Sequence, residues 1–212
     1  MKFTTLLSLA TLSATASADY FFRFSGSSKY PVINNQRLRS NTSAQYFSPG
    51  VTPPPHNPAD HFNRISVAAP SDPYTILNVV PTNPHPPPVP GYYGLSNRDG
   101  VPDAYRLVYT YRLEDEGPLF TYKEFLIIKT PGRCGPNGKT VLRYRPVGGG
   151  EWRWFAVKEK TPQGIDKWVP WYIKRSPNNI DILNTWDYEA IELELVEAKG
   201  PVNSNAPGGV EE

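Results

Sequence analysis

Aromatic side chains in the second half of the chain offer the clearest chemistry. All five tryptophans lie between residues 152 and 186. In 152–160, Trp152 and Trp154 share one face of a predicted strand, and Phe155 and Val157 share the other. Both faces cannot belong to one core, so one is covered by other parts of the chain or is available to a ligand. Aromatic rings stack on the C–H faces of sugars or anchor protein partners. The candidate ligand contacts are Trp152, Trp154, Trp168 and Trp171.

A glycine-rich stretch after 126–128 looks at first like a phosphate loop, with Lys139 and Thr140 after its last glycine. A nucleotide loop needs four residues between its glycines and then a helix. Here five residues separate Gly132 from Gly138, Pro136 removes one amide, and a β-branched stretch follows. We interpret the stretch as a hairpin turn and predict no nucleotide and no cofactor.

Metal ligands are poorly arranged. Residues 97–103, Asn-Arg-Asp-Gly-Val-Pro-Asp, resemble part of a short calcium loop, but its first ligand position falls on Leu95 and its last on Arg106. A turn that starts the next strand is the better interpretation. The three histidines stand at positions 56, 61 and 85, at spacings without metal-site geometry. We predict no metal.

Signatures of catalysis are sparse. The chain contains no Gly-x-Ser-x-Gly and no His-Glu-x-x-His. Two of the three carboxylates Glu114, Glu116 and Glu124 could form a pair for glycoside hydrolysis, although 114–118 has the composition of a solvated turn. The single cysteine, Cys134, excludes an intrachain disulfide and is interpreted as a small buried hydrophobe rather than a free thiol.

Charge is unevenly spread along the chain. Residues 131–175 hold 10 Lys/Arg against 3 Asp/Glu, and residues 176–212 hold 1 against 8. Cross-strand pairing of Arg143, Arg145 and Lys158 with the glutamates of the last strand would explain this. The alternative is a basic, tryptophan-bearing surface for a polyanion.

The N-terminus has the layout of a secretory signal peptide. A charged Met1-Lys2 precedes an apolar stretch, and Ala16-Ser17-Ala18 forms an A-x-A cleavage site. We therefore expect residues 1–18 to be removed and the protein to be secreted and extracellular. No apolar run approaches the roughly 20 residues needed to cross a bilayer. The sequon at Asn41 is a candidate N-glycosylation site.

The elements that must position these residues are strands. From Ala104 to Ala198 the sequence alternates with period two, as in 105–113 and in 186–197, where Ile191, Leu193 and Leu195 face one side. A slip at 123–124 suggests a bulge, Gly148–Gly150 suggests a hairpin, and Pro170 suggests an edge strand. We predict an all-β fold of about eight or nine strands, an antiparallel β-sandwich or flattened barrel. The predicted strands are 20–24, 74–80, 105–113, 120–129, 140–147, 152–160, 168–175 and 186–197.

Residues 19–198 are expected to form a single β domain. Its segment 49–90 holds 13 of the 24 prolines and is interpreted as a long ordered loop, because the strand predicted inside it needs a partner. Residues 199–212 are expected to be a disordered tail.

The combination of signal peptide, proline-rich stretch, aromatic β domain and acidic tail resembles the small secreted proteins of filamentous fungi, a resemblance that implies no site residues. The leading hypothesis is a secreted, non-catalytic protein that binds a glycan or cell-surface partner through aromatic residues. One alternative is a host-directed effector or toxin acting through the basic region 131–175. Another is a secreted glycoside hydrolase that uses a carboxylate pair.

Overall fold

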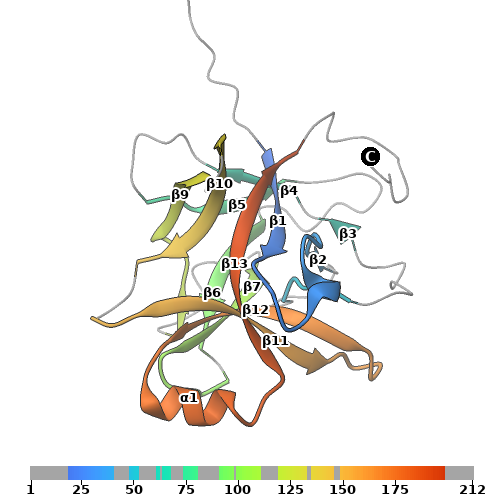
Figure 1. Cartoon of the computed structure of the whole chain (residues 1–212), viewed down its shortest axis with the longest axis vertical. Helices are drawn as coiled ribbons and strands as arrows, with labels where there is room; N and C mark the ends of the chain where they lie inside the picture. The colour runs from blue at the N-terminus through green and yellow to red at the C-terminus, as the bar shows by residue number, and fades with distance from the viewer. Residues whose placement is uncertain are drawn as a thin grey trace, which may run out of the picture.

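The computed structural model is nearly all β (Figure 1) and describes residues 19–40, 48–52, 61–62, 64–67, 74–80, 91–97, 99–110, 119–132, 135–145 and 149–198. The first strands are β1 (Asp19–Ser25), β2 (Arg39–Ser40), β3 (His61–Phe62), β4 (Arg64–Val67), β5 (Leu77–Val80) and β6 (Gly91–Ser96), with a short 3-10 helix at Pro31–Ile33. They are followed by β7 (Ala104–Thr110), β8 (Phe120–Thr121), β9 (Phe125–Gly132), β10 (Gly135–Tyr144), β11 (Trp152–Lys160), β12 (Asp166–Lys174), helix α1 (Pro177–Leu183) and β13 (Tyr188–Glu197).

Eight antiparallel strands close into a barrel. The hydrogen-bonded order is β1-β4-β5-β6-β7-β12-β11-β13, and β13 pairs back onto β1 from Tyr20↔Glu197 to Ser25↔Glu192. Closure leaves these strands without free edges within the ring. The all-β prediction is confirmed, the barrel alternative agrees with the ring, and a sandwich is not confirmed.

Alternation along each strand fills the barrel interior with apolar side chains. On β13 the inward residues are Ile191, Leu193 and Leu195, and on β1 they are Phe22 and Phe24, all in one buried cluster. The predicted inward face of β13 is therefore confirmed. Trp154 from β11 lies in the same cluster. The described side chains of this interior form a packed core.

A second, smaller core covers the outer face of β11 and β12. Phe155 and Val157 point away from the barrel interior and pack with Trp171 and Leu183. Leu183 belongs to α1, which lies at one end of the molecule beside these strands (Figure 1). The two faces of 152–160 thus belong to different cores, and the outer one is covered by a helix that the sequence analysis did not predict.

The strands β8, β9 and β10 lie outside the ring, and their pairing confirms one expectation and corrects two. The predicted strand 120–129 is interrupted at 122–124 rather than bulged, because β8 pairs with β6 whereas β9 pairs with β10. The glycine-rich stretch is the turn of the β9–β10 hairpin, as interpreted, with Gly132 opposite Gly135. The hairpin at Gly148–Gly150 is wrong, because β10 and β11 each pair with β13 and not with each other.

The edge position predicted from Pro170 is also wrong. β12 lies between β11 and β7 in the ring. The amide N–H groups of Trp168 and Lys174 bond to Val51 and Asp103, away from β11. Pro170 is an even number of residues from both Trp168 and Lys174, so its backbone nitrogen also points away from β11. It lies between the bridge to Val51 and the residues that pair with β7. No bond to β11 is lost, which is why an interior strand tolerates this proline.

The proline-rich segment contributes ordered strands to the barrel. β4 and β5 pair with each other, and β5 pairs with β6, so the strand predicted within 74–80 has its partners. The predicted signal peptide 1–18, the sequon at Asn41 and the tail 199–212 lie outside the described residues. In the ranges that the structure describes, no helix has the length and apolar character of a membrane span.

Candidate functional site

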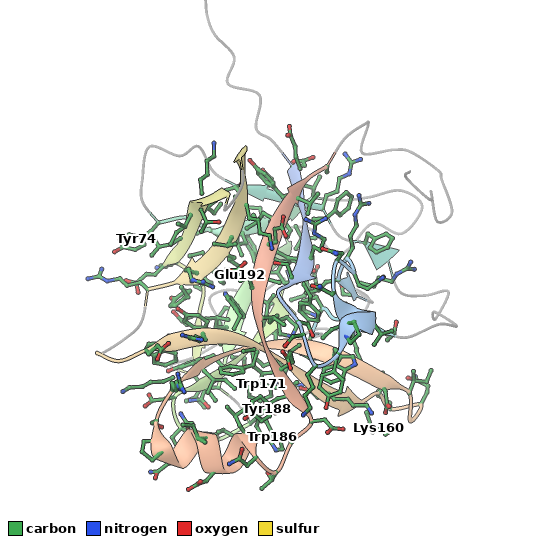
Figure 2. All side chains as sticks on the ribbon, in the orientation of Figure 1. Tyr74, Lys160, Trp171, Trp186, Tyr188 and Glu192 are labelled. Carbon is green, nitrogen blue, oxygen red and sulfur yellow. The ribbon has the colours of Figure 1, made fainter. Side chains whose placement is uncertain are left out.

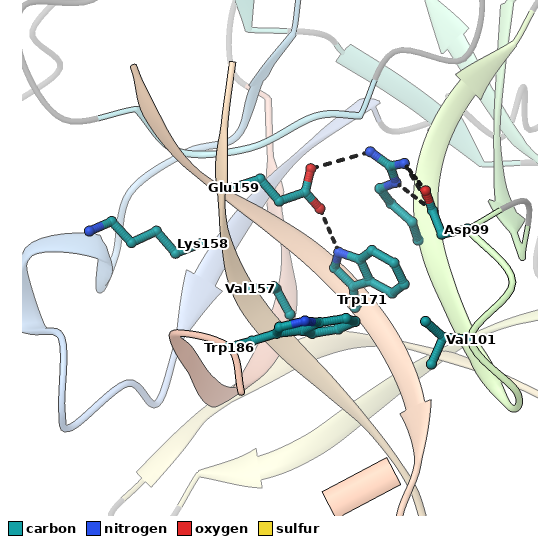
Figure 3. A pocket seen from close by; sticks show the side chains of 8 residues that line it. Asp99, Val101, Val157, Lys158, Glu159, Trp171 and Trp186 are labelled. Atoms are coloured by element: carbon teal, nitrogen blue, oxygen red, sulfur yellow. Dashed lines mark hydrogen bonds and ion pairs between the residues drawn. The ribbon is translucent and has the colours of Figure 1, made fainter. Parts of the chain in front are cut away.

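A pocket of about 280 Å³ lies where the second core meets solvent, between β7, β11, β12 and the turn before β13 (Figure 3). Figure 2 shows two of its residues, Trp171 and Trp186, on the α1 side of the molecule together with Tyr188. The apolar lining consists of Val101, Val157, Trp171 and Trp186. The polar lining consists of Asp99, Arg106, Lys158 and Glu159.

Trp171 is held in place by register and by a hydrogen bond. In β12 it stands opposite Phe155 of β11 and opposite Arg106 of β7. Its indole N–H donates to Oε1 of Glu159 at 2.8 Å. Although the residue is only 4% exposed, part of its ring lines the pocket.

Arg106 joins two carboxylates at the rim. Its Nη2 lies 2.7 and 2.9 Å from Oδ1 and Oδ2 of Asp99, and its Nε lies 3.2 Å from Oδ2. Its Nη1 donates to Oε2 of Glu159 at 3.2 Å. The guanidinium carbon lies 5.5 Å from the ring centroid of Trp171. A two-pronged pair with a carboxylate fixes the guanidinium plane, so the rim has a defined geometry.

Helix α1 delivers Trp186. Ser176 caps its start by accepting the Asn179 N–H, and Pro177 follows as the first helical residue, where its missing N–H costs nothing. After the helix, the backbone N–H of Trp186 donates to the backbone carbonyl of Leu183 at 2.8 Å. The Leu183 side chain is buried in the second core. Trp186 is half-buried, and its ring lies 5.4 Å from that of Trp171 at 54°.

Lys158 is turned away from the two indoles (Figure 3). Its Nζ lies 2.8 Å from Asp166 and 3.8 Å from Asp187. The hydrogen bond to Asp166 raises the pKa of Lys158, and the hydrogen bonds from Lys158 and then Lys160 lower the pKa of Asp166. The lysine charge is therefore balanced by its own partners rather than by the pocket.

The other candidate tryptophans lie elsewhere. Trp154 is fully buried and donates to the Leu142 carbonyl at 2.7 Å. Trp168 is 3% exposed and packs on Tyr30 with a centroid distance of 4.4 Å. Trp152 is half-buried and stacks on Tyr172 at 5.5 Å. Of the four candidates, only Trp171 lines the pocket.

Of the other candidate residues, Asp99 lines this pocket, whereas Asp103 and Glu124 do not. Asp99 and Asp103 of the calcium-like stretch pair with Arg106 and Lys174, and the chain turns here at Gly100 with φ +74°. Glu124 pairs with Arg145. His56, His85, Glu114, Glu116 and Cys134 lie outside the described residues, as does the His61 side chain. Where side chains are described, no three metal-ligating residues gather.

Among the described residues, Arg143, Arg145 and Lys158 do not form the expected ion pairs with the glutamates of the last strand, although another basic residue of 131–175 reaches one of them. Lys139 lies 3.8 Å from Glu192, but Arg145 and Lys158 pair with residues outside β13. Seven of the ten Lys and Arg residues of 131–175 have a carboxylate within 4 Å: Lys139, Arg145, Arg153, Lys158, Lys160, Lys174 and Arg175.

Sequence reasoning missed Trp186, Arg106, Asp99 and Glu159 as one site. They come from three segments: 99–106, β11 and the turn after α1. The register across β7, β12 and β11 brings Arg106 to Glu159, and the turn after α1 adds Trp186. The sequence signal that could have indicated Arg106 was the alternation of 105–113. It places the Arg106 side chain on the face of the strand that the tyrosines do not occupy. Comparisons of the chain with protein-family models, with curated proteins and with solved structures found no match.

Proposed function

We propose that this chain is a secreted, non-catalytic binding protein that holds a sugar unit of a glycan in the pocket between Trp171 and Trp186. A sugar ring has apolar C–H faces and a rim of hydroxyls. The pocket supplies both complements, because two indoles stand beside Asp99, Arg106 and Glu159. Apolar walls with a few fixed polar groups are the usual composition of a small-ligand site.

The observation that carries this proposal is the half-buried Trp186 at a pocket whose polar groups are already oriented. The side chains of Arg106, Asp99 and Glu159 are 27%, 35% and 27% exposed, so a ligand can reach them. Their mutual bonds hold them before a ligand arrives, which lowers the entropy cost of binding. The volume of about 280 Å³ is at the small end for ligand pockets and favours a single ring over a long chain.

A binding role has more support than hydrolysis. An acid catalyst must carry a proton to the leaving oxygen. Glu159 instead receives hydrogen bonds at both carboxylate oxygens, from Trp171 and from Arg106. That is the arrangement of an ionised acceptor.

The effector alternative through the basic region also has less support. A surface that attracts polyanions needs cations whose charge is not already neutralised. Most of the lysines and arginines in 131–175 pair with carboxylates of this same chain. Secretion is part of the proposal, because cell-surface glycans are met outside the cell, and the predicted signal peptide 1–18 is the basis for it.

A glycan array that carries neutral, uronic and sulfated oligosaccharides tests the proposal. The intact protein is expected to bind at least one glycan class, and Trp186→Ala is expected to reduce that binding at least tenfold. Ile180→Ala is the matched control, because Ile180 is 37% exposed on α1 but does not line the pocket. Binding that is equal in Trp186→Ala and the unaltered protein would contradict the proposal.

A further inference from the structure

The polar rim of the pocket has more acceptors than donors. An ionised carboxylate offers about four lone-pair positions, and a guanidinium has five N–H donors. Asp99 and Glu159 together accept five contacts, four of them from Arg106. Because the Nη2 contacts to both Asp99 oxygens share one N–H, these contacts use three of the five Arg106 N–H donors and the Trp171 N–H, and they leave about three carboxylate lone pairs free. The free carboxylate lone pairs therefore favour a ligand that donates hydrogen bonds.

The charge of the rim points the same way. Two carboxylates face one guanidinium, so Asp99, Arg106 and Glu159 together carry one negative charge. Lys158 does not offset it, because its ammonium group is turned toward Asp166 and Asp187. An anionic ligand would be repelled by this negative charge in a partly desolvated site. Its affinity should therefore be at least several-fold lower than that of a neutral ligand.

The net negative charge of the rim would attract a cationic ligand, but stacking of its ammonium group on Trp171 is disfavoured. The face of an indole attracts ammonium groups. At Trp171, however, a cation is already present, since the Arg106 guanidinium lies 5.5 Å from the ring centroid. An incoming ammonium group would meet the charge of this guanidinium.

We infer that the pocket selects an uncharged sugar unit, whose hydroxyls donate to Asp99 and Glu159 while its apolar face packs on Trp186, and that it rejects the corresponding uronate. This inference rests on the proposed function and adds its substrate class. Glu159 contacts the ligand directly, and Arg106 acts as a positioning residue that holds both carboxylates.

The test compares matched methyl glycosides. Methyl glucoside, methyl galactoside and methyl mannoside are each paired with the uronate that differs only by a C6 carboxylate, and an amino sugar is added as a cationic probe. Binding is measured by saturation-transfer NMR and by quenching of tryptophan fluorescence. We expect at least one neutral glycoside to bind tenfold or more tightly than its uronate and than the amino sugar.

Two variants separate the charge effect from other causes. Glu159→Gln removes one negative charge from the rim. It is expected to lower the ratio of the affinity for the neutral glycoside to the affinity for its uronate at least threefold. Glu151→Gln makes the same change of net charge at an exposed carboxylate that pairs with Arg153 and Arg175, and is expected to leave the ratio unchanged. Near-ultraviolet circular dichroism verifies that both variants are folded.

The outcomes distinguish the two proposals. Equal or tighter binding of uronates or of the amino sugar, or an unchanged ratio in Glu159→Gln, would overturn the inference and leave the glycan-binding proposal standing. Failure of every glycoside and of every glycan on the array would overturn both.

Discussion

The indole N–H of Trp171 and the carboxylate of Glu159 are joined by a hydrogen bond of 2.8 Å across the outer face of the β11–β12 pair. The other oxygen of Glu159 accepts from Arg106, which itself stands opposite Trp171 on β7. One carboxylate therefore orients both an aromatic wall of the pocket and an arginine that lines it. Without Glu159, an indole N–H and one end of the guanidinium would lose their acceptor.

The first prediction concerns this carboxylate. Glu159→Ala should lower the free energy of unfolding by about 1–2 kcal/mol, because a partly buried donor loses a charged acceptor. Glu151→Ala, which removes an exposed ion pair, should change it by less than about 1 kcal/mol. Urea denaturation measures both. If both substitutions lowered the free energy of unfolding equally, the hydrogen bond from Trp171 to Glu159 would contribute no more than an exposed ion pair.

Two tryptophans on the same strand should respond differently to removal of the indole nitrogen. Trp154 donates to the Leu142 carbonyl, so Trp154→Phe should cost about 1–3 kcal/mol. The buried N–H of Trp152 has no acceptor among the described residues, so Trp152→Phe removes an unsatisfied donor and keeps the stack on Tyr172. Its cost should be below about 0.5 kcal/mol, or the variant should be stabilised. The denaturant midpoints of the two variants, compared at an unchanged m-value, measure the two losses of stability. A larger loss for Trp152→Phe than for Trp154→Phe would contradict the prediction.

Gly94 should be the least replaceable glycine of the barrel wall. A Cβ at this position would overlap the ring of Phe120, which packs directly on the β6 backbone. Gly94→Ala should therefore destabilise the fold by about 1–3 kcal/mol through overpacking. At Gly149 a Cβ would meet nothing within 4 Å, and Gly149→Ala should stay within about 0.5 kcal/mol. Thermal unfolding of the two variants provides the comparison, and a neutral Gly94→Ala would disprove the close contact.

The pH dependence of Asp166 has a definite sign. Hydrogen bonds from Lys158 and Lys160 hold the pKa of Asp166 below its ordinary value of 3.8. Because the folded-state pKa is the lower one, the stabilisation is present above the ordinary value and is lost as the pH falls through the folded-state value. Carboxyl NMR titration should place the midpoint below 3.8 in the unaltered protein and return it toward 3.8 in Lys158→Met. Lys174→Met, which removes a partner of Asp103, should leave the Asp166 midpoint in place, and a shift there would contradict the local origin of the effect.

Strand content could be predicted from the sequence because its signal is local. The period-two alternation on 152–160 coincides with β11 as observed. The same rule identified the inward residues Ile191, Leu193 and Leu195 of β13. The sequence predictions were wrong where the choice of strand partner, rather than local propensity, decides the structure. Gly148–Gly150 has a turn composition, but β10 and β11 find different partners across it.

The candidate site shows the same division more sharply. The sequence by itself determined that Trp152 and Trp154 would share one face of a strand and that Phe155 and Val157 would share the other, since alternation is a property of neighbouring residues. Which indoles face solvent was decided only by the tertiary structure. Barrel closure seals Trp154 inside, and α1 carries Trp186 to the pocket. Arg106 and Glu159 stand 53 positions apart and meet because register between strands, which no local pattern encodes, aligns β7, β12 and β11.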